Sequence, residues 1–227
     1  MKSRPKREKR VECDGAKCSA EGNAFRSVEG SCRAGVPASL LRGLTREAAR
    51  VGKENATGGC RKGCECAGRF LYTRLGHEPV EIAGSSECVW FVVGFWEGTC
   101  EGPGESVPGP GDDVLRRIRT RGEFLDPAPA RPEGECDRRP CRGLAEAHIT
   151  VERRPDQGID GDLFLALVDR ASETARRAAD ARCPGGCSCA GEFFVTSTGI
   201  ERIRPHGRRR WIWWVGGYWA GTCRRFY

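Results

Sequence analysis

The sequence lacks two features that would place it in a membrane or mark it for export. It has no apolar run of about 18 residues or more, which is the length that a membrane-spanning helix needs. Its basic N-terminus is followed by Val11-Glu12-Cys13-Asp14 rather than by the apolar stretch of a secretory signal peptide. The sequence therefore predicts no membrane span and shows no visible signal peptide.

The motifs of common catalytic sites are missing as well. No Gly-rich phosphate loop, no metalloprotease helix and no nucleophile elbow occurs in the chain. Histidine, the most frequent general base, is represented only by His77, His148 and His206, which lie in dissimilar surroundings. We therefore expect a protein that is not an enzyme, has no catalytic residue and uses no cofactor.

Cysteine, by contrast, is abundant and follows a repeat. Fourteen of the 227 residues are cysteine, and six of them recur at a constant offset of 123. The first set is Cys13, Cys18, Cys60, Cys64, Cys66 and Cys100, and the second is Cys136, Cys141, Cys183, Cys187, Cys189 and Cys223. The register needs no insertion or deletion between the copies. Because segments of one length with matching cysteines share one fold, the chain is expected to contain two copies of one module.

The repeat boundaries and the composition predict the domain order. The chain divides into a basic tail at 1–10, a cysteine-rich module at 11–100, a Pro/Gly-rich linker at 101–133, a second cysteine-rich module at 134–223 and a C-terminal tail at 224–227. Six of the thirteen prolines lie in the linker, as is typical of an interdomain connection. A short helix is predicted within it, over 112–125.

Hydrophobic periodicity predicts one helix per module. In the second copy Leu163, Leu167 and Ala171 begin a series with a period of four residues, which is typical of an amphipathic helix. Asp160 or Asp162 is the expected N-cap of this helix. The first copy repeats the pattern with Ser39 as the expected cap.

Strands are expected on both sides of each helix. The segment at 147–152 and its counterpart at 24–29 alternate as strands do, and aromatic and β-branched residues gather at 192–196 and 211–218. Trp96 and its counterpart Trp219 are expected to be core residues rather than a stacking platform. The predicted fold is α+β: two tandem cysteine-rich β-α-β-β modules, each a small antiparallel sheet with one packed helix.

Two chemistries fit six cysteines per module. The short spacings Cys13-x4-Cys18 and Cys60-x3-Cys64-x-Cys66 resemble the knuckles of a zinc site with four thiolates. A reducing compartment, which the missing signal peptide suggests, would favour such thiolates. However, six ligands exceed the four that one zinc ion takes, and paired C-x2-C knuckles are absent.

The cysteines that break the repeat favour disulfides. Cys32 and Cys88 have no counterparts in the second copy, where Pro155 and Trp211 stand at these positions. A cross-link requires that both cysteines be present or absent together, so a disulfide between these two is expected. The fourteen cysteines would then form seven disulfides without a free thiol. This count favours an oxidising or extracellular compartment.

The connectivity of the six shared cysteines stays open at this point. Cys64 and Cys66, which are separated by one residue, are expected to bond to different partners, because a disulfide requires a specific Cα separation and dihedral angle. Cys13 and Cys18 are candidates for those partners, since such bonds would tie the start of the module to the end of its helix.

Arginine and tryptophan gather in one stretch of the second copy that has no equivalent in the first. The candidate binding surface consists of Arg208, Arg209, Arg210, Trp211 and Trp214. Guanidinium groups beside aromatic rings are the ingredients of a site for nucleic acid or an anionic glycan, whereas a solvated hairpin turn is the structural alternative and the preferred interpretation. The net charge of +7 does not decide the matter, because most of the excess lies in the tail at 1–10.

Taken together, these patterns predict a non-enzymatic, disulfide-stabilised tandem-repeat protein that works by binding a protein or by structural self-assembly. The alternative is an intracellular zinc-binding adaptor or nucleic-acid-binding protein that uses the basic tail and the Arg/Trp-rich strand.

Overall fold

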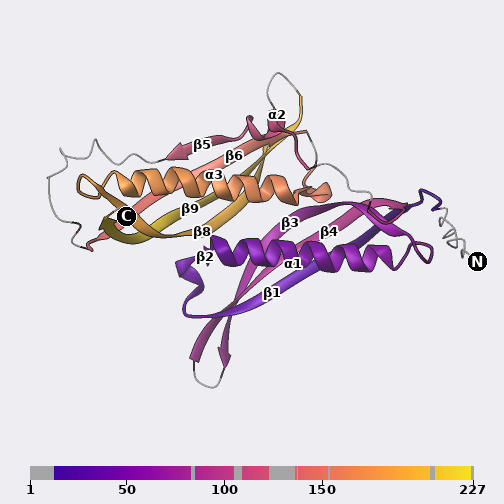
Figure 1. Ribbon diagram of the computed structural model, residues 1–227, viewed down its shortest axis with the longest axis horizontal. Helices are drawn as coiled ribbons and strands as arrows, with labels where there is room; N and C mark the ends of the chain where they lie inside the picture. The colour runs from indigo at the N-terminus through magenta and orange to yellow at the C-terminus, as the bar shows by residue number, and fades with distance from the viewer. Residues whose placement is uncertain are drawn as a thin grey trace, which may run out of the picture.

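The computed structural model describes residues 13–82, 85–104, 109–122, 136, 138–152, 154–204 and 208–225. The predicted basic tail lies outside the described residues, as do residues 123–133 of the predicted linker and the last two residues of the chain. The described residues form two antiparallel sheets and three α-helices, with more residues in strands than in helices (Figure 1). The predicted α+β class is therefore confirmed.

The first sheet is built mainly from the first half of the chain. Its long strands are β1 (Lys17–Glu29), β3 (Glu65–Ile82) and β4 (Ser85–Glu101), and β4 lies between the other two. Between β1 and the helix come a 3-10 turn, η1 (Cys32–Ala34), and the two-residue strand β2 (Val36–Pro37). Helix α1 (Ala38–Thr57) packs against this sheet, mainly against β1 and β4.

The second half has the same order of elements. They are β6 (Pro140–Val151), η2 (Pro155–Gln157), β7 (Ile159–Asp160), α3 (Gly161–Asp180), β8 (Cys187–Ile203) and β9 (Arg210–Arg225). In the second sheet β9 lies between β8 and β6, so it is a central strand. Its central place explains why apolar side chains occur on both of its faces.

The segment between the halves contributes a strand where the sequence predicts a helix. Within the described part of the helix expected over 112–125, which ends at residue 122, α2 (Asp112–Leu115) is helical and β5 (Arg119–Gly122) pairs with β6 at the edge of the second sheet. A short helix without tertiary support is marginal in water. The edge of β6 offers backbone hydrogen bonds to the residues of β5, and this pairing overrides the weak helical pattern.

Each half places its short strand in the sheet of the other half. β2 pairs with β8, with Val36 opposite Val195, and β7 pairs with β3, with Ile159 opposite Tyr72. The exchange is reciprocal, because both pairs occupy the same positions in the repeat. Helices α1 and α3 also contact each other, and Figure 1 shows them running along the long axis of the molecule. The two sheets therefore form one body.

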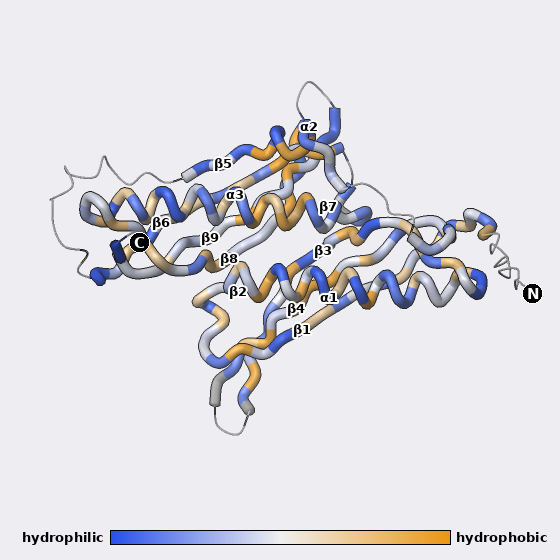
Figure 2. The backbone as a smooth tube through the Cα atoms, viewed as in Figure 1, coloured by the Kyte–Doolittle hydropathy of each residue, from blue (hydrophilic) through white to orange (hydrophobic). Residues whose placement is uncertain are grey.

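A single hydrophobic core spans both halves. Tyr72 of β3 stacks on Phe164 of α3, with ring centroids 3.6 Å apart. Trp213 of β9 meets the Tyr72 ring edge-on, with centroids 6.2 Å apart. The Tyr72 hydroxyl lies 3.5 Å from Oγ1 of Thr198, and burial raises the pKa of this tyrosine. Figure 2 shows apolar and polar residues alternating along both long helices, as expected for helices with one buried face.

Helix α1 begins without the predicted cap. Pro37 holds the N-cap position and makes no side-chain hydrogen bond, so the prediction of Ser39 as the cap is wrong. Ser39 lies in the first turn, where its backbone N–H and its hydroxyl both donate to the carboxylate of Glu192. Glu192 belongs to β8, so an acid from the opposite half satisfies the start of this helix. Sequence within one module cannot predict such a contact.

Helix α3 begins at a predicted cap. Oδ1 of Asp160 accepts hydrogen bonds from the backbone N–H groups of Asp162, at 3.0 Å, and Leu163, at 3.3 Å. Its other oxygen, Oδ2, lies 3.9 Å from Nη1 of Arg69 on β3. Burial raises the pKa of the Asp160 carboxyl, and the capping hydrogen bonds and Arg69 oppose this shift only in part.

Asparagine at position 160 is expected to change the pH dependence of stability. Because the pKa of Asp160 is higher in the folded than in the unfolded chain, the folded state keeps this proton longer as the pH rises. The contribution of the carboxyl to stability therefore falls through a window that begins near its ordinary pKa of 3.8. Asp160→Asn keeps a capping oxygen but does not titrate.

Urea unfolding of both proteins from about pH 3 to about pH 7 measures this effect. The difference in unfolding free energy between Asp160→Asn and the unchanged protein should move in favour of the variant as the pH rises through the window. A difference that stays constant with pH would contradict the raised pKa.

Candidate functional site

All fourteen cysteines lie in the described residues, and together they form seven disulfides with no free thiol. The first half contains Cys13–Cys64, Cys18–Cys66, Cys60–Cys100 and Cys32–Cys88. The second half contains Cys136–Cys187, Cys141–Cys189 and Cys183–Cys223. The same three connections thus recur at the offset of 123. The prediction of a disulfide-stabilised protein is confirmed.

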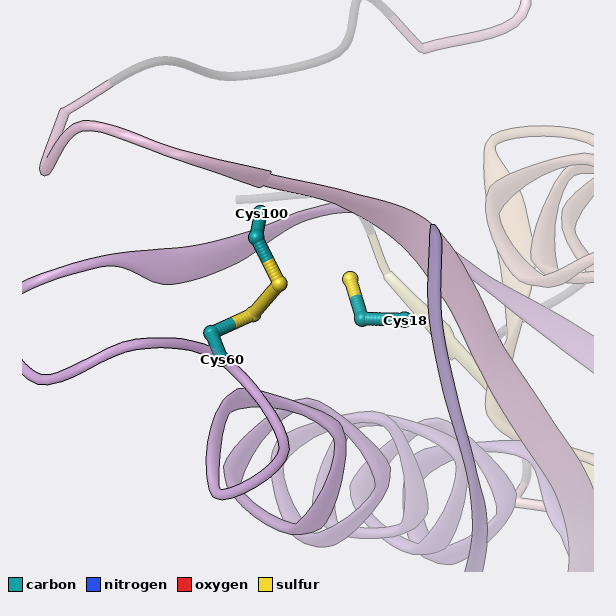
Figure 3. Close-up of side chains that lie close together, drawn as sticks. All are labelled: Cys18, Cys60 and Cys100. Atoms are coloured by element: carbon teal, nitrogen blue, oxygen red, sulfur yellow. A yellow bond between two sulfur atoms is a disulfide. The ribbon is translucent and has the colours of Figure 1, made fainter. Parts of the chain in front are cut away.

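In each half two of these disulfides lie against one another. The Sγ atoms of Cys18, Cys60 and Cys100 are within 4.8 Å of one another, and Figure 3 shows the Cys18 side chain directed at the Cys60–Cys100 bond. The second half repeats the arrangement with Cys141, Cys183 and Cys223. We call these two groups the sulfur clusters. Each packs with an alanine near the C-terminal end of its helix, so sulfur extends the core there.

The sulfur clusters also locate the thiolates that reduction would release. Zinc binds thiolates in tetrahedral sets of four, and reduction of Cys18–Cys66 and Cys60–Cys100 would supply four in one place. In the disulfide form these sulfur atoms bond to each other and carry no thiolate charge. The set differs from the one that the spacings suggested, because Cys13 and Cys64 form a bond of their own.

The second half has a hollow in the region where the first half has the Cys32–Cys88 disulfide. Trp211 on β9 stands at the position of Cys88, and Pro155 stands at that of Cys32. The volume of this hollow is about 470 Å³, and we call it the arginine hollow. Its lining residues are Glu152, Arg154, Arg202, Arg209 and Trp211.

Three segments of the second half bring these side chains together. Trp211 pairs with Val151 of β6 on one side and with Arg202 of β8 on the other. Arg209 immediately precedes β9, and Arg154 immediately precedes η2. The central strand therefore carries the indole, while its flanking segments supply the guanidinium groups.

Positive charge dominates the arginine hollow. Oε1 of Glu152 lies 3.4 Å from Nη2 of Arg210, and Arg154 pairs with Asp156 at 3.0 Å. In the described part of the chain, Arg202 and Arg209 have no salt-bridge partner. The hollow therefore offers two uncompensated guanidinium groups beside one aromatic ring.

The structure divides the predicted Arg/Trp surface between two faces. Side chains alternate along a strand, so Trp211 and Trp214 lie on opposite faces of β9. Trp214 packs over Gly199 of β8, where a Cβ atom would come within 2.4 Å of the indole. Arg208 is exposed and lies outside the lining of the hollow, whereas Arg210 is occupied by its ion pair.

Arg154 and Arg202 are the hollow residues that the sequence did not reveal. Arg202 lies near the end of β8, close to Arg209 in the chain, whereas Arg154 lies far from it and joins it only because β6 also flanks β9. One signal was available: a cross-link between two segments of the first copy implies that their counterparts are also neighbours in the second. The replacement of Cys32 and Cys88 therefore marks this region in the sequence.

Trp96 and Trp219 help to hold the sulfur clusters in place. Each indole is half-buried. Nε1 of Trp96 donates a hydrogen bond to the backbone carbonyl of Cys66 at 3.1 Å, and Nε1 of Trp219 donates one to that of Cys189 at 3.2 Å. Cys66 and Cys189 are the disulfide partners of cluster cysteines. Both indoles pack against the cores, as the core interpretation expects.

The fold and its cross-links define a cysteine-rich α+β protein with two antiparallel sheets and seven disulfides. Comparisons with protein-family models, with curated proteins and with solved structures found no match to this chain. No helix in the described ranges is both long and apolar enough to cross a membrane. The function is therefore inferred from the arrangement of residues.

Proposed function

We propose that the protein is a non-enzymatic binding protein, built from a duplicated module and braced by disulfides, that works in an oxidising compartment. Three disulfides that recur at one offset support a duplication covering 11–100 and 134–223. The reciprocal exchange of β2 and β7 supports two copies docked as a pair. Such a cross-linked body suits a protein that presents a fixed surface to a partner.

The arginine hollow carries this proposal, and its partner is an acidic segment of another protein. Arg202 and Arg209 supply uncompensated guanidinium groups, which bind carboxylates through paired charge-assisted hydrogen bonds. Trp211 adds an aromatic surface on which the stem of a glutamate side chain can pack. A hollow of about 470 Å³ has room for side chains of a peptide segment.

Nucleic acid and anionic glycans are the less suitable partners for this hollow. Non-specific binding to nucleic acid gains affinity with each phosphate that a cation neutralises. The hollow itself offers two uncompensated arginines, which provide few such contacts. The partner class is therefore an acidic peptide segment.

A labelled hexaglutamate peptide is the probe that tests this proposal. Arg202→Ser combined with Arg209→Ser should weaken its binding by about tenfold, because each exposed guanidinium–carboxylate pair contributes up to about 1 kcal/mol. Fluorescence anisotropy at fixed low salt measures the affinity. The matched control is Arg26→Ser combined with Arg33→Ser, which removes the same charge from exposed positions of the first half.

The proposal fails if the control pair weakens binding as much as the hollow pair does, or if the peptide does not bind. A single-stranded oligonucleotide and heparin are measured in parallel. If either polymer binds more tightly than the peptide and loses this binding in the Arg202→Ser, Arg209→Ser variant, that polymer replaces the acidic peptide as the partner class.

The zinc-binding adaptor is a second candidate because each sulfur cluster, together with Cys66 or Cys189, would supply four thiolates on reduction. Protein purified without chelator should have an intact mass lower by fourteen hydrogens than the reduced chain, since seven disulfides remove two each. A metal assay on the same sample should find no zinc. Two zinc ions per chain together with reactive thiols would establish the zinc-binding alternative and contradict the proposal of a disulfide-bonded protein.

A further inference from the structure

A second cavity lies where the two halves meet. It has a volume of about 340 Å³, and we call it the interface cavity. One wall is the side of α1 that carries Arg46 and Ala49, and the opposite wall is the start of α3 with Asp162 and Leu165. Phe70 of β3 and Trp96 of β4 also line it, so the cavity has an apolar floor.

The repeat has a counterpart of this cavity, and side chains bridge it. The offset of 123 relates Arg46 to Asp169 and Leu165 to Arg42. At the counterpart position Nη2 of Arg42 lies 2.9 Å from Oδ1 of Asp169, so a salt bridge joins the two helices. In the interface cavity an arginine and a leucine stand at the same places and make no such pair.

A second cross-contact is also replaced. Ser39 donates to Glu192 at the counterpart position. The repeat places Asp162 and Arg69 there in the interface cavity. Arg69 instead pairs with Glu97 at 3.6 Å and approaches Asp160 at 3.9 Å. Cross-contacts between the halves therefore close the counterpart position, whereas the residues at the equivalent places leave the interface cavity open.

The charges of the cavity leave one cation and one anion without partners. Lys53 is compensated by Glu65, whose carboxylate lies 3.2 Å from Nζ. Within the described residues neither Arg46 nor Asp162 has a salt-bridge partner, and they do not pair with each other although both line the same cavity. A ligand that fits them must therefore carry both signs of charge.

We propose that the interface cavity binds a small zwitterion with an apolar side chain, which is the chemistry of a free apolar amino acid. Its carboxylate binds the guanidinium of Arg46, and its ammonium group binds the carboxylate of Asp162. Its side chain packs on Phe70, Trp96 and Leu165. The volume of the cavity lies within the ordinary range for small-molecule sites.

Three leucine derivatives test the charge requirement by isothermal titration calorimetry. Leucine carries both charges, N-acetylleucine lacks the ammonium charge, and leucinamide lacks the carboxylate. Saturable binding of leucine with one site per chain is expected, and each derivative should bind about tenfold or more weakly. Equal binding of either derivative, or no saturable binding of leucine, would overturn the proposal.

A paired substitution tests the location. Arg46→Asp combined with Leu165→Arg copies the Arg42–Asp169 salt bridge into the cavity, so this variant should fold and should lose leucine binding. Arg46→Gln alone should weaken leucine about tenfold and leave leucinamide unchanged. Arg50→Gln, on the same helix but outside the lining, is the matched control.

Thermal unfolding of each variant verifies that it is folded before binding is measured. Leucine binding that persists in the paired variant would place the ligand elsewhere and overturn the site. The acidic peptide assay is independent of this result, because the arginine hollow shares no lining residue with the interface cavity.

Discussion

Alanine in place of Phe164 is expected to lower the free energy of unfolding by about 3–5 kcal/mol. Phe164 lies on α3, is 1% exposed and stacks on Tyr72 of the other half. The substitution Phe164→Ala therefore removes core contacts and leaves a cavity where the two halves meet. Urea unfolding followed by tryptophan fluorescence measures the loss.

Two further variants show whether the loss comes from the shared core. Phe25 lies on β1 and is 76% exposed, so Phe25→Ala should change stability by no more than about 0.5 kcal/mol. Tyr72→Phe keeps the stacked ring and removes only the hydroxyl near Thr198, so its cost should be about 1 kcal/mol or less. A loss in Phe164→Ala as small as that in Phe25→Ala would contradict a core common to both halves.

Removal of the Cys18–Cys66 disulfide is expected to destabilise the protein more than removal of Cys13–Cys64. The two bonds close loops of similar length, with sequence separations of 48 and 51. Loop-closure entropy alone therefore predicts nearly equal losses of about 4 kcal/mol. The packing differs, because Cys18 and Cys66 are both buried and adjoin the Cys60–Cys100 disulfide, whereas Cys64 is buried but its partner Cys13 is only half-buried.

The double variant Cys18→Ala with Cys66→Ala should exceed Cys13→Ala with Cys64→Ala by about 1–2 kcal/mol, which is the added cost of a cavity in a buried cluster. Equilibrium unfolding without reductant compares the two pairs directly. Equal losses would mean that the sulfur clusters contribute only through chain entropy.

The comparison of the two halves of the sequence made the main helices and strands and one cross-link predictable. Ala171 and its periodic neighbours indicate α3, and the joint replacement of Cys32 and Cys88 indicates their bond, which the structure contains. The pairing of the six shared cysteines stayed open, because identical spacings in the two halves allow the same pairings in each. These inferences rest on local periodicity and on comparison within one chain, and neither requires knowledge of how the copies dock.

Contacts between the halves were not predictable in the same way. β2 and β7 are two residues long, so they have no alternation that a sequence pattern could detect. The helix predicted over 112–125 gives way to β5 at Arg119–Gly122, because β6 presents a free edge to these residues. The interface cavity was missed for a related reason, since Arg46 and Asp162 lie on different helices that meet only after docking.

The reciprocal exchange of β2 and β7 resembles the interface of a symmetric homodimer, except that a tether joins the two subunits. Tethering replaces a diffusive encounter with an effective local concentration in about the millimolar range. The melting temperature should consequently be unaffected by about hundredfold dilution, whereas that of an untethered pair would fall. A tether also allows the two halves to differ, because a substitution in one chain enters one side of the interface alone. The halves do differ in this way: the first contains the Cys32–Cys88 disulfide, and the second has the arginine hollow.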